Sequence, residues 1–67
     1  MKSFAKRLIE LRKEKGISQA DLAKEMTVSK SVVCYWETDR SEITAPNLIL
    51  LSKYFGVSTD YLLGLED

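Results

Sequence analysis

The sequence predicts an all-α fold in which five short helices form one domain over residues 1–67. Serine stands ahead of several helix-periodic apolar segments, where it is a favoured N-cap, and glycine follows them, where it ends helices. The single proline, Pro46, stands where a further helix is expected to begin. No stretch alternates apolar and polar residues, and no Asn-Gly or Asp-Gly pair predicts a hairpin.

The first predicted helix follows Ser3, its expected N-cap, and ends at Gly16. Phe4, Leu8 and Leu11 are spaced three or four residues apart, so they share one face of this helix. Gly16 suits the left-handed position after a helix, where a side chain is unfavourable.

Two further helices are expected in quick succession. Ser18 caps the earlier one, and Asp21, three residues on, completes a capping box. This helix should end near Met26, because Ser29 already caps the next. Only residues 27–29 separate the two, and a turn this short makes helices cross steeply instead of lying antiparallel.

The last two predicted helices follow a polar loop over residues 38–45. Pro46 is expected at the first position of the fourth helix, which ends at Gly56. Ser58 caps a short fifth helix, and Gly64 closes it.

Composition excludes several classes of function. The chain has no histidine, no glycine-rich phosphate loop and no evident nucleophile–base pair, so we expect no enzyme, no metal, no cofactor and no small-molecule substrate. One cysteine, Cys34, excludes an internal disulfide and favours a reducing, cytoplasmic location. The start of the chain has no apolar signal-peptide run, and no segment is long enough to span a membrane.

The charges are unevenly distributed although they cancel overall. Ten Lys and Arg residues balance ten Asp and Glu residues. Residues 1–37 carry a net charge of +3, and residues 38–67 carry −3. A polyanion is therefore expected to contact the first half of the chain.

The third predicted helix has two different faces. Val32, Val33 and Trp36 are expected to point inward, which turns the opposite face outward. That outward face holds Lys30, Ser31, Cys34, Tyr35 and Thr38. Uncharged polar groups with a single cation suit contacts with base edges in a DNA major groove.

The order and spacing of several segments resemble one family. These segments are Ile17-Ser18-Gln19-Ala20-Asp21-Leu22-Ala23, Val28-Ser29, Val33, Trp36-Glu37, Leu51-Ser52-Lys53, Gly56-Val57-Ser58 and Asp60-Tyr61-Leu62-Leu63. Over residues 4–63 they are similar to the Cro/CI (XRE) family of phage and bacterial repressors. The resemblance implies a five-helix, lambda-repressor-like domain whose helix-turn-helix, at about residues 19–38, binds two-fold operator DNA as a dimer.

At two positions the chain departs from that family. Thr27 and Asp39 stand where the family usually has glycine. A β-branched residue in a left-handed conformation costs roughly 1–2 kcal/mol, whereas Asp tolerates that region better.

The predicted DNA contacts fall into two classes. Gln19, at the start of the second helix, is expected to contact phosphate, as the family's matching glutamine does, although a solvated glutamine is the alternative. Lys30 is expected to contact a guanine edge or a phosphate, and Arg40 either contacts phosphate or is an ordinary loop residue. Ser31, Cys34 and Tyr35 are expected to contact bases in the groove, although ordinary surface residues are the alternative. Ser29 and Thr38 are further predicted DNA contacts. A redox role for Cys34 is the weaker alternative to a groove contact.

Three further predictions concern pairing, assembly and the competing function. The resemblance implies an ion pair between Arg12 and Glu37; the alternative is that they are two independent surface charges. The dimer interface is expected at Tyr61, Leu62, Leu63 and Leu65, because so short a helix cannot bury four large apolar residues; the alternative is that they close the core. The competing function is a protein-interaction module, such as a toxin–antitoxin or anti-repressor partner, which the zero net charge and the acidic, leucine-rich tail favour.

Overall fold

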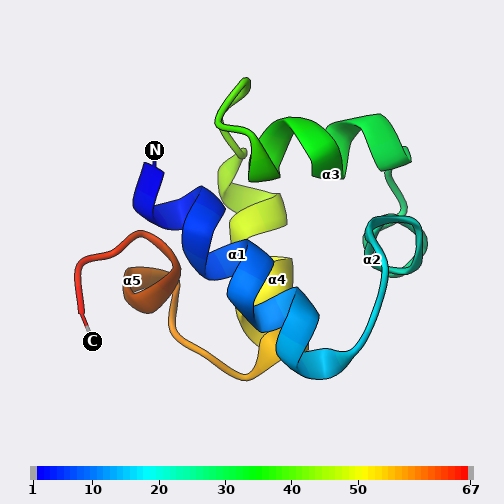
Figure 1. Ribbon diagram of the computed structural model, residues 1–67. Coiled ribbons are helices and arrows are strands. Elements are labelled where there is room, and N and C mark those ends of the chain that lie inside the picture. The colour runs from blue at the N-terminus through cyan, green and yellow to red at the C-terminus, as the bar shows by residue number, and fades with distance from the viewer. Residues whose placement is uncertain (1, 67) are drawn as a thin grey trace.

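All regular structure in residues 2–66, the range that the computed structural model describes, is helical. The elements are α1 (Lys2–Lys15), α2 (Gln19–Met26), α3 (Lys30–Glu37), α4 (Ala45–Phe55) and α5 (Thr59–Leu62) (Figure 1). The predicted all-α class and the five predicted helices are confirmed. Figure 1 views α2 along its axis and α3 from the side, so these two helices cross steeply, as their three-residue turn predicts. No helix of this range combines the length and apolar character needed to cross a membrane.

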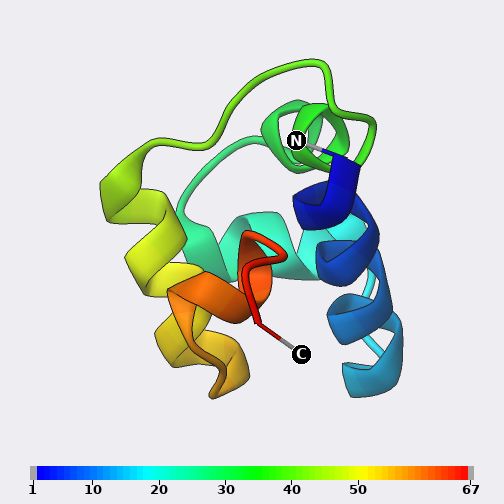
Figure 2. The same cartoon turned by 90° about the vertical axis from the view of Figure 1, so that its left-hand side faces the viewer.

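Every helix contributes to one apolar core. One fully buried side chain comes from each, in chain order Leu8, Leu22, Val33, Leu51 and Leu62. Phe4 and Trp36 fill the space around them. The short α5 packs against both α1 and α4 (Figure 2), and its Leu62 is fully buried in the core.

The predicted caps of α2, α3 and α5 are present. The Ser18 hydroxyl accepts from the Asp21 amide at 3.0 Å, and the Asp21 carboxylate accepts from the Ser18 amide at 3.0 Å. Ser29 and Ser58 accept in the same way from the amides three residues on. Hydrogen bonds from the Ser18 amide and, less strongly, the Ser18 hydroxyl lower the pKa of Asp21, so the capping carboxylate stays ionised.

Two predicted helix starts are wrong by one or two residues. Helix α1 already includes Lys2, so Ser3 lies inside it and is not its N-cap. Ser3 packs against the end of α5 instead: a Cβ on Gly64 would lie 2.6 Å from the Ser3 Cβ. Helix α4 begins at Ala45, which leaves Pro46 at its second position. The first amides of a helix have no intrahelical acceptor, so the missing N–H of proline costs nothing there.

A left-handed residue follows each of the five described helices. Three of these residues are glycines, and the other two, Thr27 (φ 57°) and Asp39 (φ 60°), flank α3. At Thr27 the turn is closed by the Val28 amide, which donates to the Ala23 carbonyl at 3.0 Å. The prediction that Thr27 and Asp39 occupy glycine-type positions is confirmed.

Replacing Thr27 with glycine is expected to raise the free energy of unfolding by about 0.5–1 kcal/mol. Removing a β-branched residue from the left-handed region stabilises the folded chain by ~1–2 kcal/mol. The greater backbone freedom of glycine in the unfolded chain offsets ~0.5–1 kcal/mol of this gain. Urea denaturation measures the difference. Thr44→Gly is the matched control, because Thr44 has extended backbone and no side-chain cap bond, so glycine there should destabilise slightly.

Candidate nucleic-acid interface

Burial fixes the orientation of α3. Val33 and Trp36 are buried with 0% and 3% exposure, and Val32 packs partly against the same core. The opposite face of α3 therefore points away from the protein. Tyr35 on this face is 44% exposed, a high value for a large aromatic side chain in a small domain.

Lys30, Ser31, Cys34, Tyr35 and Thr38 lie on this outer face, as their spacing predicts, but two of them differ in what they present. Lys30, Ser31 and Thr38 are exposed, but Cys34 is only partly exposed, because it lies nearer the edge of the buried stripe. The Thr38 hydroxyl donates to the Cys34 carbonyl at 2.8 Å. The hydrogen of that hydroxyl is therefore already used, and Thr38 can only accept a hydrogen bond from a base edge.

The starts of α2 and α3 both present backbone amides. In α2 the Leu22 amide donates to the Ser18 carbonyl, and the Asp21 amide donates to the Ser18 hydroxyl. The two preceding amides, of Gln19 and Ala20, have no acceptor within the helix. In α3 the Val32 amide donates to both the carbonyl and the hydroxyl of Ser29, and the Val33 amide donates to the Ser29 carbonyl. Such helix ends attract anions through their N–H groups and the helix dipole.

A buried carboxylate ties three helices together behind this surface. Glu37, at the end of α3, accepts from Arg12 of α1 twice: Arg12 Nε lies 2.6 Å from Glu37 Oε2, and Arg12 Nη2 lies 3.1 Å from Glu37 Oε1. The side chain of Glu37 is 3% exposed and that of Arg12 is 14% exposed. The hydrogen bond to Glu37 raises the pKa of Arg12. The ion pair implied by the resemblance is thus present in the structure.

The same carboxylate also holds Gln19, a contact that the sequence does not predict. Gln19 Nε2 donates to Glu37 Oε1 at 2.9 Å, and Arg12 Nη1 donates to the Ile17 carbonyl at 3.0 Å. The segment leading into α2 and the first residue of α2 are therefore both bound to the Arg12–Glu37 pair. No local pattern signals a contact between positions 19 and 37, because they belong to different helices and only their crossing brings them together.

Arg40 lies in the loop that leaves α3. Its side chain is exposed, and its amide donates to the Tyr35 carbonyl at 2.9 Å. This hydrogen bond closes the turn at Asp39 and keeps the start of the loop against the end of α3. Arg40 is thus anchored by its backbone beside the outer face of α3.

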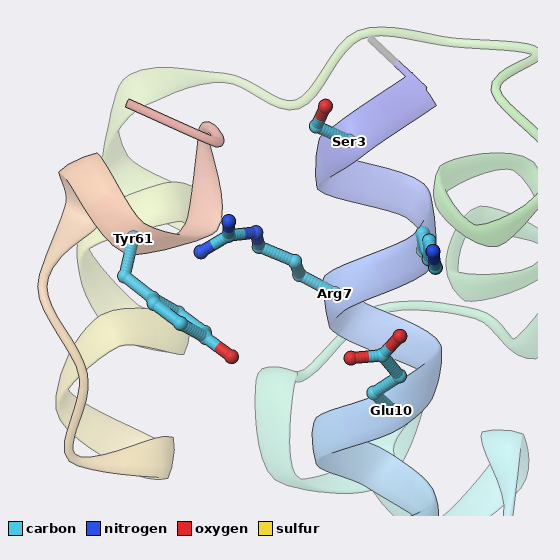
Figure 3. Close-up of a pocket in the computed structure, with 5 residues that line it drawn as sticks. Ser3, Arg7, Glu10 and Tyr61 are labelled. Atoms are coloured by element: carbon cyan, nitrogen blue, oxygen red, sulfur yellow. The ribbon is translucent and has the colours of Figure 1, made fainter. Parts of the chain in front are cut away.

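The structure corrects one predicted dimer-interface residue. Leu62 has 0% exposure and cannot contact a second chain, because it is buried in the core where α5 packs against α1 and α4. Tyr61 and Leu63 are partly buried, and only Leu65, at 73% exposure, projects fully. Figure 3 shows Arg7 of α1 reaching across to Tyr61, with its guanidinium 4.2 Å from the ring centroid.

Glu66, the last residue that the structure describes, is held by α1 and by the N-cap of α5. Arg7 donates to the Glu66 carbonyl at 2.7 Å, and the Ser58 hydroxyl donates to the Glu66 carboxylate. The Leu65 amide also donates to the Asp60 carbonyl at 2.8 Å, so Leu65 is exposed on a backbone that is held in place. Ile49 and Leu50 of α4 are also exposed, at 47% and 50%. The sequence does not indicate which residues of the apolar run 48–51 are exposed.

Two short helices that cross at a three-residue turn, with one outward polar face, define a helix-turn-helix domain. A family profile described as helix-turn-helix matches residues 8–62, and the chain belongs to this family. The resemblance to repressors of this type is thereby confirmed.

Sequence comparison finds transcriptional regulators among the relatives. The chain is 44% identical over 55 residues to the HTH-type transcriptional regulator PrpR of Mycobacterium tuberculosis, covering 82% of this chain and 11% of PrpR. It is 34% identical over 65 residues to the HTH-type transcriptional regulator ImmR of Bacillus subtilis, covering 97% of this chain and 51% of ImmR. The chain thus spans about half or less of these two relatives.

Structure comparison finds a repressor and a transcriptional regulator. The P22 c2 repressor, crystallised in complex with a synthetic operator, superposes with a TM-score of 0.87 and 36% identity, covering 94% of this chain and 96% of that one. A transcriptional regulator from Listeria innocua superposes with a TM-score of 0.88 and 31% identity, covering 96% of this chain and 60% of that one. Fold similarity over nearly the whole chain accompanies the sequence similarity in both cases.

Proposed function

We propose that the chain is a sequence-specific, DNA-binding transcriptional regulator of the repressor type, which places α3 in the major groove of operator DNA. The observation that carries this is the outer face of α3, whose exposed polar side chains and Tyr35 are held outward by the buried Val33 and Trp36. The similarity to a repressor crystallised with its operator supports it. Lys30, Ser31, Cys34 and Tyr35 face the bases, and Gln19 and Arg40 face phosphates.

The experiment that tests this function is selection of bound sequences from random double-stranded DNA, followed by titration at several salt concentrations. We expect one enriched two-fold motif and an affinity that falls steeply with salt, because phosphate contacts release counterions. Binding to DNA without sequence preference contradicts the role of α3. Salt-insensitive binding to a protein, with no DNA binding, supports the protein-interaction module, which the exposed Leu65, Ile49 and Leu50 favour.

We further propose a homodimer on DNA, with Leu65 at the interface and Tyr61 and Leu63 beside it. Two-fold operators place half-sites about one helical turn, roughly 34 Å, apart, and a symmetric dimer matches that spacing. The proposed location is the bacterial cytoplasm, as expected of a DNA-binding regulator with a free thiol at Cys34.

Replacing Leu65 with lysine is expected to abolish cooperative binding to a two-site operator while leaving affinity for a single half-site nearly unchanged. A charge in an apolar interface is unfavourable, whereas Leu65 lies outside the proposed DNA surface. Titration of both DNA forms gives the comparison. Leu50→Lys is the matched control, since Leu50 is also exposed and apolar; loss of cooperativity in that variant alone would place the interface on α4.

A further inference from the structure

The hydrogen bond between Gln19 and Glu37 joins the start of α2 to the end of α3. Gln19 Nε2 lies 2.9 Å from Glu37 Oε1, and the same oxygen accepts from Arg12 Nη2 at 3.1 Å. We propose that Glu37 is a positioning residue, which orients the Gln19 amide so that it donates to a DNA phosphate. This inference rests on the proposed function, since it concerns how one of the proposed phosphate contacts is prepared.

Amide chemistry explains why a carboxylate suits this task. A glutamine side chain that is free to rotate can turn either its N–H donors or its carbonyl oxygen outward. A phosphate oxygen is an acceptor, so it binds only the N–H end of the amide. Glu37 also only accepts, so it binds the nitrogen end of the amide and fixes which way Gln19 faces. Glu37 takes one of the two N–H groups, and the second has no hydrogen-bond partner within residues 2–66. That second N–H remains for a phosphate oxygen.

The charge of Glu37 does not oppose DNA binding, because Arg12 neutralises it. Arg12 donates to both carboxylate oxygens, and the pair is largely shielded from solvent. Arg12 also binds the Ile17 carbonyl just ahead of α2, which fixes the backbone from which Gln19 projects. Backbone and side chain are therefore both ordered before DNA arrives, which reduces the entropy lost on binding.

The experiment is a double-mutant cycle on affinity for the selected operator, with Gln19→Ala, Glu37→Gln and the double variant. Glu37→Gln removes a negative charge, which by itself strengthens DNA binding. We expect it nevertheless to weaken binding by roughly two- to tenfold, the effect of one side chain that must be ordered on binding. Gln19→Ala should cost much less affinity in the Glu37→Gln background than in the wild type. If the affinity loss of the double variant equals the product of the losses of the two single variants, the inference is overturned.

Two matched variants separate positioning from charge and from stability. Glu25→Gln removes one negative charge from an exposed site on α2 and should bind as tightly as the wild type or more tightly. Arg12→Lys disturbs the ion pair but keeps the carboxylate that holds Gln19, so Gln19→Ala should retain its full effect there. If Arg12→Lys abolishes the effect of Gln19→Ala as Glu37→Gln does, the role is structural only.

A spectroscopic measurement on the unbound wild-type chain tests the contact even if Glu37→Gln does not fold or no operator is found. Gln19 is the only glutamine and Asn47 the only asparagine, so the side-chain amide region of the NMR spectrum contains two pairs of signals. We expect one Gln19 amide proton to be protected from exchange with water and the other to exchange readily. Equal, fast exchange of both protons overturns the inference, whereas protection without any DNA binding by the chain counts against the proposed function alone.

Discussion

Replacement of Arg12 by methionine is expected to lower the free energy of unfolding by about 3–5 kcal/mol. Methionine keeps the apolar part of the side chain but offers no donor, so both Arg12 bonds to Glu37 are lost. Glu37 is 3% exposed, and water reaches it poorly. Its carboxylate then keeps only the Gln19 N–H, and an undercompensated buried charge is far more costly than the intact pair is stabilising.

Urea denaturation followed by circular dichroism measures this loss. For a chain of this length each kcal/mol lowers the melting temperature by about 4–8 °C, so the two forms should be clearly separated. Lys13→Met is the matched control: Lys13 is exposed in the same last turn of α1, and its replacement should change stability by less than about 0.5 kcal/mol. A loss below ~1 kcal/mol for Arg12→Met would show that the carboxylate is satisfied without the guanidinium.

Most helix ends were predictable, because they depend on residues close together in the chain. The capping box of Ser18 and Asp21 spans three residues, and the turn at Thr27 follows from where α2 must stop before the Ser29 cap. The outward face of α3 was also predictable, since three apolar residues at helical spacing decide its orientation. Local chemistry is enough in these cases, because the interacting groups are neighbours in sequence.

What the sequence did not predict depends on contacts between distant helices. Ser3 looks like an N-cap in isolation, but its surroundings are set by Gly64 of the chain end. Leu62 and Leu65 are equally apolar, yet Leu62 lies in the core and Leu65 in solvent. The Gln19–Glu37 bond requires the crossing angle of α2 and α3 and the position of Arg12, none of which a residue pattern specifies.

Substitutions on the outer face of α3 are expected to change which bases the chain prefers. The hydroxyls of Ser31 and Tyr35 donate or accept, and each good base contact discriminates by ~1–3 kcal/mol, or about five- to 150-fold in affinity. Ser31→Ala and Tyr35→Phe remove one hydroxyl each and leave the buried face of α3 unchanged. The preference should therefore relax at the contacted position while other positions keep theirs.

Titration over all single-base variants of the selected operator gives the preference at each position. Arg40→Ala should behave differently, since loss of a phosphate contact weakens binding to every variant alike and reduces the salt slope by about one unit. Ser52→Ala is the matched control, because its hydroxyl donates to the Ile49 carbonyl of its own helix, α4. If Ser31→Ala and Tyr35→Phe leave the preference as unchanged as Ser52→Ala does, these hydroxyls do not select bases. Specificity would then have to come from Lys30, Cys34 or the shape of the DNA, and Tyr35→Ala would show whether the ring itself is needed.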